Sequence, residues 1–293
     1  MSLSQSTLIY RVKALIGDDT EWEGSLTAQS LAADTTIDVN DGTDWSEGDV
    51  MEFSDGELAL VQSIATNAVT VKRGHLGTTA ATQSSGSAIR KNPVFYLKDV
   101  KDALDLTIQT LWPYAWKAVD DTITPVGGTY WYDVASDAVD IITVSQLYGT
   151  SDSLVGIFGA DHYTERPIVW STNLPTALVA SGRGLGFPGG FFHSSNTVYV
   201  RYRAKLTATL SSSAYSDLSD GLLAEVVAHG AAARLVMAKE APRVTQDDLS
   251  AGNVSVPPQA RLTAANYLAT KFRELRNQYK DELERTIPAA GSV

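Results

Sequence analysis

The four histidines are the side chains best suited to acid–base or metal chemistry, and their spacing supports neither. They are His75, His162, His193 and His229. No two of them stand in an H-E-x-x-H arrangement. The chain has no cysteine, which excludes thiolate metal ligands, disulfides and cysteine nucleophiles. We therefore expect no catalytic residue, no cofactor and no metal site.

Two further patterns carry possible chemistry. Asp161 precedes His162 and could orient its imidazole, with Glu165 close by, so a wall hydrolase remains an alternative. Residues 184–189, GLGFPG, match G-x-G-x-x-G, but a strand rather than a helix is predicted after them, which argues against a dinucleotide site. We interpret residues 181–196 as a long hairpin tip.

Three phenylalanines fall on this predicted hairpin tip, namely Phe187, Phe191 and Phe192. Exposed aromatic side chains are a liability for a monomer, so we expect a neighbouring subunit or a partner to cover them. Packing on the chain's own β-rich region is the alternative.

The charge balance argues against a broad nucleic-acid interface. The net charge of -11 repels a phosphate backbone, although an acidic channel lets DNA slide past without sticking. Basic residues gather in two places, for which contact with an acidic neighbour is expected before contact with DNA. One group is Lys72, Arg73, Arg90 and Lys91, and the other, on one face of a strand, is Arg201, Arg203 and Lys205.

The elements that must position these residues alternate between two textures. Apolar residues at helical spacing predict helices over 4–17, 94–119, 214–241 and 259–286, whereas short alternating runs with Gly and Asp turns predict strands between them. None of the four predicted helices is polar on every side, so their apolar faces should pack together. We expect an α+β fold: a discontinuous helical bundle interrupted by two β-rich insertions, a small β-barrel and a β-sandwich.

The expected boundaries follow from these changes of texture. They are an N-terminal core helix in 1–21, a β-barrel-like insertion in 22–92, a core helix in 93–121, a β-sandwich-like insertion in 122–210, C-terminal core helices in 211–286 and a flexible tail in 287–293. Candidate strands in the second insertion are 129–134, 141–148, 166–170, 177–180 and 197–206.

The last helix carries an apolar seam flanked by charges of both signs. Such a helix packs along another helix and can also line an interface between identical subunits. The candidate interface residues here are Arg273, Arg276 and Tyr279, with Ile287 and Val293 in the tail.

One stretch resembles a small β module of tailed-bacteriophage structural proteins. It runs from Gly48 to Glu57, through NAVTVKRGHLGTTAA at 67–81, to Gly86–Ile89, and the RG-x-x-GTTAA core is its most specific part. In this core Gly74 and Gly77 permit a positive-φ turn, and Arg73 can bridge to a carboxylate such as Glu57.

The helices resemble the helical core of phage head-to-tail connector proteins, the adaptors that bind beneath the portal ring. This resemblance implies a virion neck protein, made in the host cytoplasm, that forms a homo-oligomeric ring, usually twelve-fold. Its partners would be other copies of itself, the portal protein, stopper or tail-tube proteins, and genomic DNA passing through the lumen without sequence-specific binding. The tail is a candidate for the portal contact. Neither the N-terminus nor any apolar run suggests a membrane segment.

The leading alternative is a tail-tip or baseplate structural protein with a carbohydrate-binding β domain. In that case Trp131, Trp170 and Phe191 should line one groove.

Overall fold

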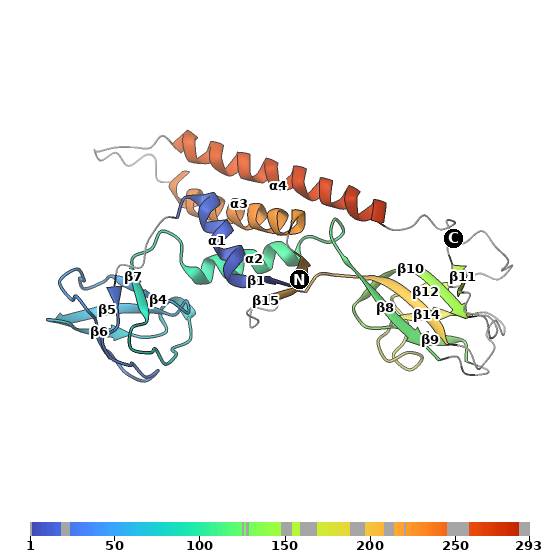
Figure 1. Cartoon of the computed structure of the whole chain (residues 1–293), viewed down its shortest axis with the longest axis horizontal. Coiled ribbons are helices and arrows are strands. Elements are labelled where there is room, and N and C mark those ends of the chain that lie inside the picture. Colours follow the sequence, from blue (N-terminus) through green and yellow to red (C-terminus); the bar gives the residue numbers. More distant parts are fainter. Residues whose placement is uncertain are drawn as a thin grey trace. The chain divides into compact units, whose positions relative to one another are not determined.

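The computed structural model describes residues 2–18, 24–124, 126, 129–147, 154–158, 169–187, 197–207, 214–219, 221–244 and 258–286. The fold is mixed α+β, as predicted, with four helices and several sheets among these residues (Figure 1). No helix in the described ranges combines the length and the apolar character that crossing a membrane requires.

The chain forms two compact units, each made from two separate stretches. Unit 1 comprises Met1–Thr107 and Thr209–Arg273, and unit 2 comprises Ile108–Ala208 and Glu274–Val293. The first β insertion and the helices around it thus share a unit, whereas most of the second insertion lies in the other.

The first helix of unit 1, α1 (Gln5–Ile16), has the ends that its sequence predicts. The Ser4 hydroxyl accepts a hydrogen bond from the Thr7 amide at 3.2 Å, and Gly17 ends the helix in the left-handed conformation. The side chains that α1 buries completely are Leu8 and Val12.

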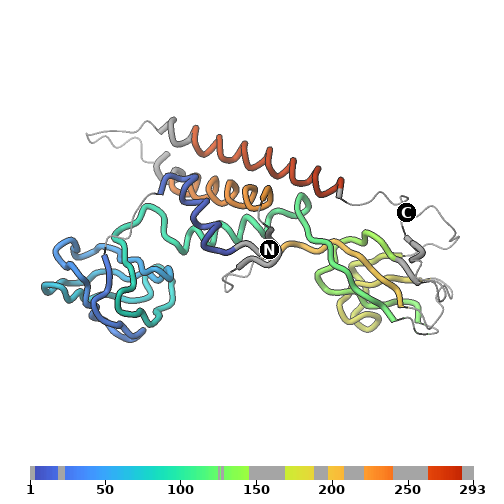
Figure 2. The backbone as a smooth tube through the Cα atoms, in the orientation of Figure 1, coloured from blue at the N-terminus to red at the C-terminus, as the bar shows by residue number. Residues whose placement is uncertain are grey.

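The β module of unit 1, residues 24–91, is one six-stranded sheet in the order β2-β7-β4-β5-β6-β3. Figure 2 shows the chain winding through this module between α1 and α2. A bridge between Leu26 and Val39 joins its two outer strands, so the sheet curls back on itself around an apolar core. The strands are β2 (Gly24–Ser25), β3 (Thr36–Asp38), β4 (Val50–Phe53), β5 (Leu58–Ala65), β6 (Ala68–Lys72) and β7 (Ala88–Lys91), with a short 3₁₀ turn η1 (His75–Gly77).

The other helices are α2 (Leu97–Gln109), α3 (Leu222–Val244) and α4 (Pro258–Thr286). Helix α1 packs against α3, and Arg11 Nη1 lies 2.9 Å from Glu225 Oε1 across that contact. Gly230 of α3 is a point of close approach in unit 1. A Cβ atom there would lie 2.5 Å from Thr107 Cγ2 and 2.8 Å from the Phe272 ring.

Two stretches expected to be helical contain strands. Helix α2 ends at Gln109, and β8 (Lys117–Ile123) begins before residue 119. Exposed side chains alternate along β8, which is the period-two pattern of a strand. The helical periodicity of the residues before it extends the predicted helix over the start of this strand. Similarly, β15 (Ala214–Ser219) precedes α3 and pairs with β1 (Ser2–Ser4), a partner about 210 residues away in the sequence.

Unit 2 contains two antiparallel sheets, in the orders β11-β10-β14-β8 and β12-β13-β9. Both sheets contribute side chains to one buried cluster, which includes Val144, Val200 and Tyr202 from the first and Tyr132 and Leu185 from the second. The remaining strands are β9 (Trp131–Asp133), β10 (Ala138–Leu147), β11 (Leu154–Phe158), β12 (Val169–Ser171), β13 (Gly184–Gly186) and β14 (Val198–Ala204).

The predicted hairpin tip at 181–196 is wrong at its beginning. Gly184–Gly186 is strand β13, which lies between β12 and β9 with all three residues buried. Glycine is favoured at position 186 because a Cβ atom there would lie 2.8 Å from the Trp131 indole. The strand expected at 177–180 is a turn instead.

Candidate functional site

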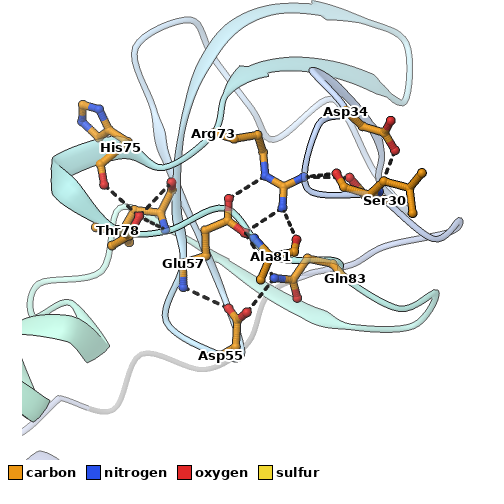
Figure 3. A network of polar contacts seen from close by, with 11 residues as sticks. Ser30, Asp34, Asp55, Glu57, Arg73, His75, Thr78, Ala81 and Gln83 are labelled. Carbon is orange, nitrogen blue, oxygen red and sulfur yellow. Dashed lines mark hydrogen bonds and ion pairs between the residues drawn. The ribbon is translucent and has the colours of Figure 1, made fainter. Parts of the chain in front are cut away.

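The most extensive polar site in the β module is built around the Arg73–Glu57 ion pair (Figure 3). Arg73 stands at the end of β6 and Glu57 just before β5. Arg73 Nε and Nη2 donate to the two carboxylate oxygens of Glu57 at 2.6 Å each, and both side chains are buried. The predicted bridge between these two residues is confirmed.

The remaining N–H groups of Arg73 bind two other loops. Nη1 donates to Ser30 Oγ at 2.9 Å and to the Leu31 carbonyl at 3.0 Å, and Nη2 also donates to the Ala81 carbonyl at 2.6 Å. The Ala81 amide in turn donates to Glu57 at 2.9 Å. All five guanidinium N–H groups are therefore occupied, which leaves Arg73 with none to offer a phosphate or a substrate.

The turn that follows Arg73 has the left-handed backbone that its glycines predict. Gly74 and Gly77 have φ values of 65° and 78°, and Leu76 between them also has a positive φ, of 51°. The Thr78 hydroxyl donates to the His75 carbonyl at 2.9 Å and accepts from the Leu58 amide at 3.1 Å. The turn is thus fastened to β5 at one end and to Arg73 at the other.

A second ion-pair site, which the sequence did not reveal, surrounds Arg90 on β7. Its guanidinium is fully buried and donates to Glu52 of β4 and to the Phe95 carbonyl at 3.0 Å, and it lies 3.5 Å from Asp18. Glu52 also accepts from the Leu97 amide at the start of α2. This cluster joins the β module to the chain on either side of it.

Burial shifts the pKa of two groups in this cluster, Glu52 and Lys13. Desolvation raises the pKa of Glu52 above its ordinary value, while Arg90 and the Leu97 amide act in the opposite direction. Lys13 of α1 lies 3.6 Å from Asp18, and desolvation followed by the charge of Arg90 lowers the pKa of Lys13. The site is a balanced cluster of two cations and two carboxylates.

Most of the predicted basic groups are paired within the chain. Lys91 Nζ lies 2.8 Å from Asp49, Arg201 binds Asp120 at 2.7 Å, and Arg203 lies 3.4 Å from Asp140. The hydrogen bond from Arg201 lowers the pKa of Asp120. Arg201 and Arg203 thus pair with carboxylates of the same chain, on strands β8 and β10 on either side of β14, and their contact with a separate acidic partner stays a prediction.

Phe187 does not offer a surface to a partner, so the expectation for this residue is wrong. Its side chain is 4% exposed and packs edge-on against Tyr132, with ring centroids 5.6 Å apart, in the core of unit 2. It directly follows the buried strand β13, which carries it inward. Phe191, Phe192, Ile287 and Val293 lie outside the described residues.

The candidate residues on α4 differ in exposure. Arg273 is exposed, whereas Arg276 and Tyr279 are half-buried. The Arg276 guanidinium lies 3.6 Å from the centre of the Tyr114 ring, and burial raises the pKa of Tyr279. Only Arg273 among the three remains well exposed to a partner.

The tryptophans expected to line a carbohydrate groove lie on opposite faces of their sheet. Trp131 stands beside Gly186, whereas Trp170 stands beside Leu185, the next residue along β13. Neighbouring residues of a strand point to opposite sides, and Trp170 packs against the core. Phe191, Asp161, His162 and Glu165 lie outside the described residues.

Unit 1 has an open apolar groove between α2 and α3, of about 630 Å³. Leu106 and Met237 in its wall are 48% and 42% exposed. No pattern in the sequence predicts this groove, because the periodic apolar positions of α2 identify its buried face and do not include Leu106. The apolar lining is Phe95, Ala103, Leu106, Leu235, Met237 and Ala238, and the charged rim is Asp99, Asp102, Arg234 and Lys239.

Within the described ranges, no group of three or more metal-binding side chains comes together. His229 is half-buried on α3, with Nδ1 2.8 Å from the Glu225 carbonyl. No protein-family model matches the sequence, and a search of curated proteins also finds no match.

Proposed function

We propose that this chain is a non-catalytic assembly protein, a head-to-tail adaptor in the neck of a tailed-phage virion. It would form a ring beneath the portal protein and contact stopper or tail-tube proteins below. The observation that carries the proposal is the Arg73–Glu57 network, because it gives the RG-x-x-GTTAA stretch a purely architectural use.

The two ion-pair sites support a mechanical role. Catalytic groups need accessible atoms with free hydrogen-bonding capacity, whereas all five guanidinium N–H groups of Arg73 donate to other groups of the same chain. Arg90 is likewise buried with its counter-charges. Both sites hold loops and elements in fixed positions, as a protein that bears load between partners requires.

The charge distribution suits a channel through which DNA passes. The net charge is -11, and Lys91, Arg201 and Arg203 pair with carboxylates of the same chain. Paired cations release few counterions from DNA and therefore bind it weakly. An acidic ring lumen would let the genome slide.

The helices supply the proposed ring with its subunit contacts. We infer that α1 to α4 act as a discontinuous bundle. The contact between α1 and α3 and the close approach of Thr107 and Phe272 to Gly230 support this inference. The exposed side of α4 around Arg273 would face a neighbouring subunit.

The experiment is to image the purified chain, alone and mixed with the portal protein of the same virion, by negative-stain electron microscopy. We expect closed rings, or portal particles with an added ring of density, at low and at moderate salt. Particles that remain monomeric with unmodified portals under every condition would exclude the adaptor function.

A further inference from the structure

Trp131 lies flat on strand β13 of unit 2, with one face of its indole against the backbone. A Cβ atom at Gly186 would lie 2.8 Å from Trp131 Cζ3, and 3.1 Å and 3.0 Å from the ring atoms on either side of it, Cε3 and Cη2. Distances this similar place the Cβ position above the ring plane, because an approach along the ring edge would leave the two flanking atoms much farther away. The opposite face of the indole therefore points away from the sheet.

The outer face of this indole belongs to an apolar surface that is open in part. Trp131 is half-buried as a whole. Val169 lies across Gly186 from it on the same face of the sheet and is 43% exposed. No described residue places a second ring or a cation over Trp131. The described part of unit 2 thus leaves one aromatic face for a ligand.

The loop 174–182 lies beside the indole on the same side of the sheet. Leu174 Cδ1 and Val179 Cγ1 lie over Gly184, where a Cβ atom would come within 2.9 Å and 3.2 Å of them. Gly184 and Gly186 are two positions apart on one face of β13, which is roughly 7 Å. The loop and the flat indole are therefore neighbours on the outer face of this strand.

Asp133 adds a carboxylate next to the indole. It stands two positions from Trp131 on β9, so the two side chains share a face of the sheet. Asp133 Oδ1 accepts hydrogen bonds from the Ser181 amide, at 3.1 Å, and from the Ser181 hydroxyl, which orient the carboxylate. Within the described part of the chain, Asp133 Oδ2 and Trp131 Nε1 form no hydrogen bond. An open acceptor and an open donor therefore accompany the open ring face.

This combination of groups matches the chemistry of a sugar. The C–H groups on one side of a pyranose ring carry weak positive charge and pack on the electron-rich face of an indole. Its hydroxyls both donate and accept hydrogen bonds, as Asp133 Oδ2 and Trp131 Nε1 require. Asp133 and the net charge of -11 repel phosphates and other anions, which favours a neutral sugar over a base carried on a nucleic-acid backbone.

We propose that Trp131 and Asp133 form a binding site for a neutral hexopyranose unit of a glycan. The sugar stacks on the outer face of the indole and donates a hydroxyl hydrogen bond to Asp133 Oδ2. Trp170 takes no part, because it packs against the core on the other face of the sheet. The site lies within unit 2 and does not depend on the proposed ring, so either proposal can fail without the other.

Fluorine NMR of the whole chain tests the site. The chain has six tryptophans, so fluorotryptophan labelling gives six resonances, which replacing each tryptophan by phenylalanine in turn assigns. The probes are hexasaccharides of glucose, galactose, mannose and N-acetylglucosamine. We expect at least one of them to shift the Trp131 resonance with a dissociation constant on the order of 1 mM and to leave the Trp170 resonance in place.

Two results of this titration would overturn the proposal. One is a Trp131 resonance that does not move with any of the four sugars at roughly 5 mM, where a millimolar site is mostly filled. The other is a stronger response to a single-stranded oligodeoxynucleotide or to a uronic-acid oligosaccharide, which would show that the site prefers an anion.

Two variants separate recognition from folding. D133N keeps an oxygen for Ser181 and turns the open oxygen into an amide nitrogen, so its thermal unfolding midpoint should stay level while sugar binding weakens roughly fivefold or more. W131A should abolish binding. The control Y199A removes another exposed aromatic side chain of unit 2 and should bind as the natural chain does. Unchanged affinity in D133N, or equal affinity in W131A and Y199A, would contradict the inference.

Discussion

The guanidinium of Arg73 donates hydrogen bonds to three loops at once. The stability lost on replacing Arg73 therefore depends on how many of these hydrogen bonds the new side chain can form. Lysine keeps the charge but cannot reproduce the paired contacts with Glu57 or reach Ser30, Leu31 and Ala81 together. We expect R73K to lower the free energy of unfolding by about 2–4 kcal/mol and to speed amide exchange in residues 74–83. The adjacent exposed Lys72 is the control, since K72R should change stability by less than about 0.5 kcal/mol. Unchanged exchange in R73K would contradict the structural role.

Tyr202 gives unit 2 a distinctive response to alkaline pH. Desolvation, followed by the charge of Asp137 and its hydrogen bond at 3.1 Å, raises the pKa of the Tyr202 phenol to about 12. An acid whose pKa is higher in the folded state than its ordinary 10.0 stabilises the fold below pH 10, and that stabilisation disappears as the pH rises toward 12. Urea unfolding should show this loss between pH 10 and 12 in the natural chain and a smaller loss in Y202F. Equal slopes in the two proteins would show that the phenol is not responsible.

Individual residues were predictable where the partners belong to one local pattern. Arg73 and Glu57 flank the short hairpin of β5 and β6, and the glycine turn follows directly after Arg73, so their bridge could be predicted from the sequence. Arg90 and Glu52 are 38 positions apart, on strands β7 and β4 whose pairing depends on the whole sheet. Phe187 was misjudged because a glycine-rich stretch, normally a loop, is here a buried strand covered by Trp131.

At the scale of elements, the Arg90 cluster fastens the β module to the helices. Removing either charge unbalances a buried cluster of two cations and two carboxylates, so E52Q and R90M should each destabilise unit 1 by about 3–5 kcal/mol. The double variant should cost less than the sum, with a coupling energy of about 2 kcal/mol or more. The exposed pair Asp120–Arg201 is the control, since D120N/R201Q should couple by less than about 1 kcal/mol. Similar coupling at the two pairs, measured by urea unfolding, would argue against this fastening role.

Gly230 tests how closely the helices of unit 1 approach. Alanine is the better helix former by about 1 kcal/mol, but its Cβ would lie 2.5 Å from Thr107 Cγ2 and 2.8 Å from the Phe272 ring. We expect G230A to destabilise unit 1 by about 1–3 kcal/mol net. The change T107S removes that methyl and keeps the hydroxyl that donates to the Ala103 carbonyl at 2.7 Å, so G230A/T107S should regain part of the loss. A stabilised G230A in thermal unfolding would contradict close packing here.

Elements with clear end signals were predicted well, and elements defined by distant partners were not. Ser4 and Gly17 mark the ends of α1 in the sequence itself. Strands β8 and β15 occupy stretches that were expected to be helical, because each is defined by pairing, with β14 and with β1, that no local pattern reveals. Strand β13, three residues long and two of them glycine, has almost no signal of its own.

At the scale of the whole molecule, the division into units follows packing rather than chain order. The texture of the sequence separates six segments, but the first β module joins the surrounding helices in unit 1 through the Arg90 cluster. The groove between α2 and α3 arises only when two helices distant in sequence come together. A groove of this kind is set by tertiary packing, so no local pattern in the sequence reveals it.

At the same scale, we propose that copies of this chain form a ring on the portal. Its most direct test is mass photometry of the purified 31.4 kDa chain with portal particles, followed by imaging of the complexes for symmetry. We expect a single complex whose added mass is a fixed multiple of the mass of one chain and whose images show one closed ring with rotational symmetry. Added mass that grows continuously with concentration, or no added mass at all, would contradict it.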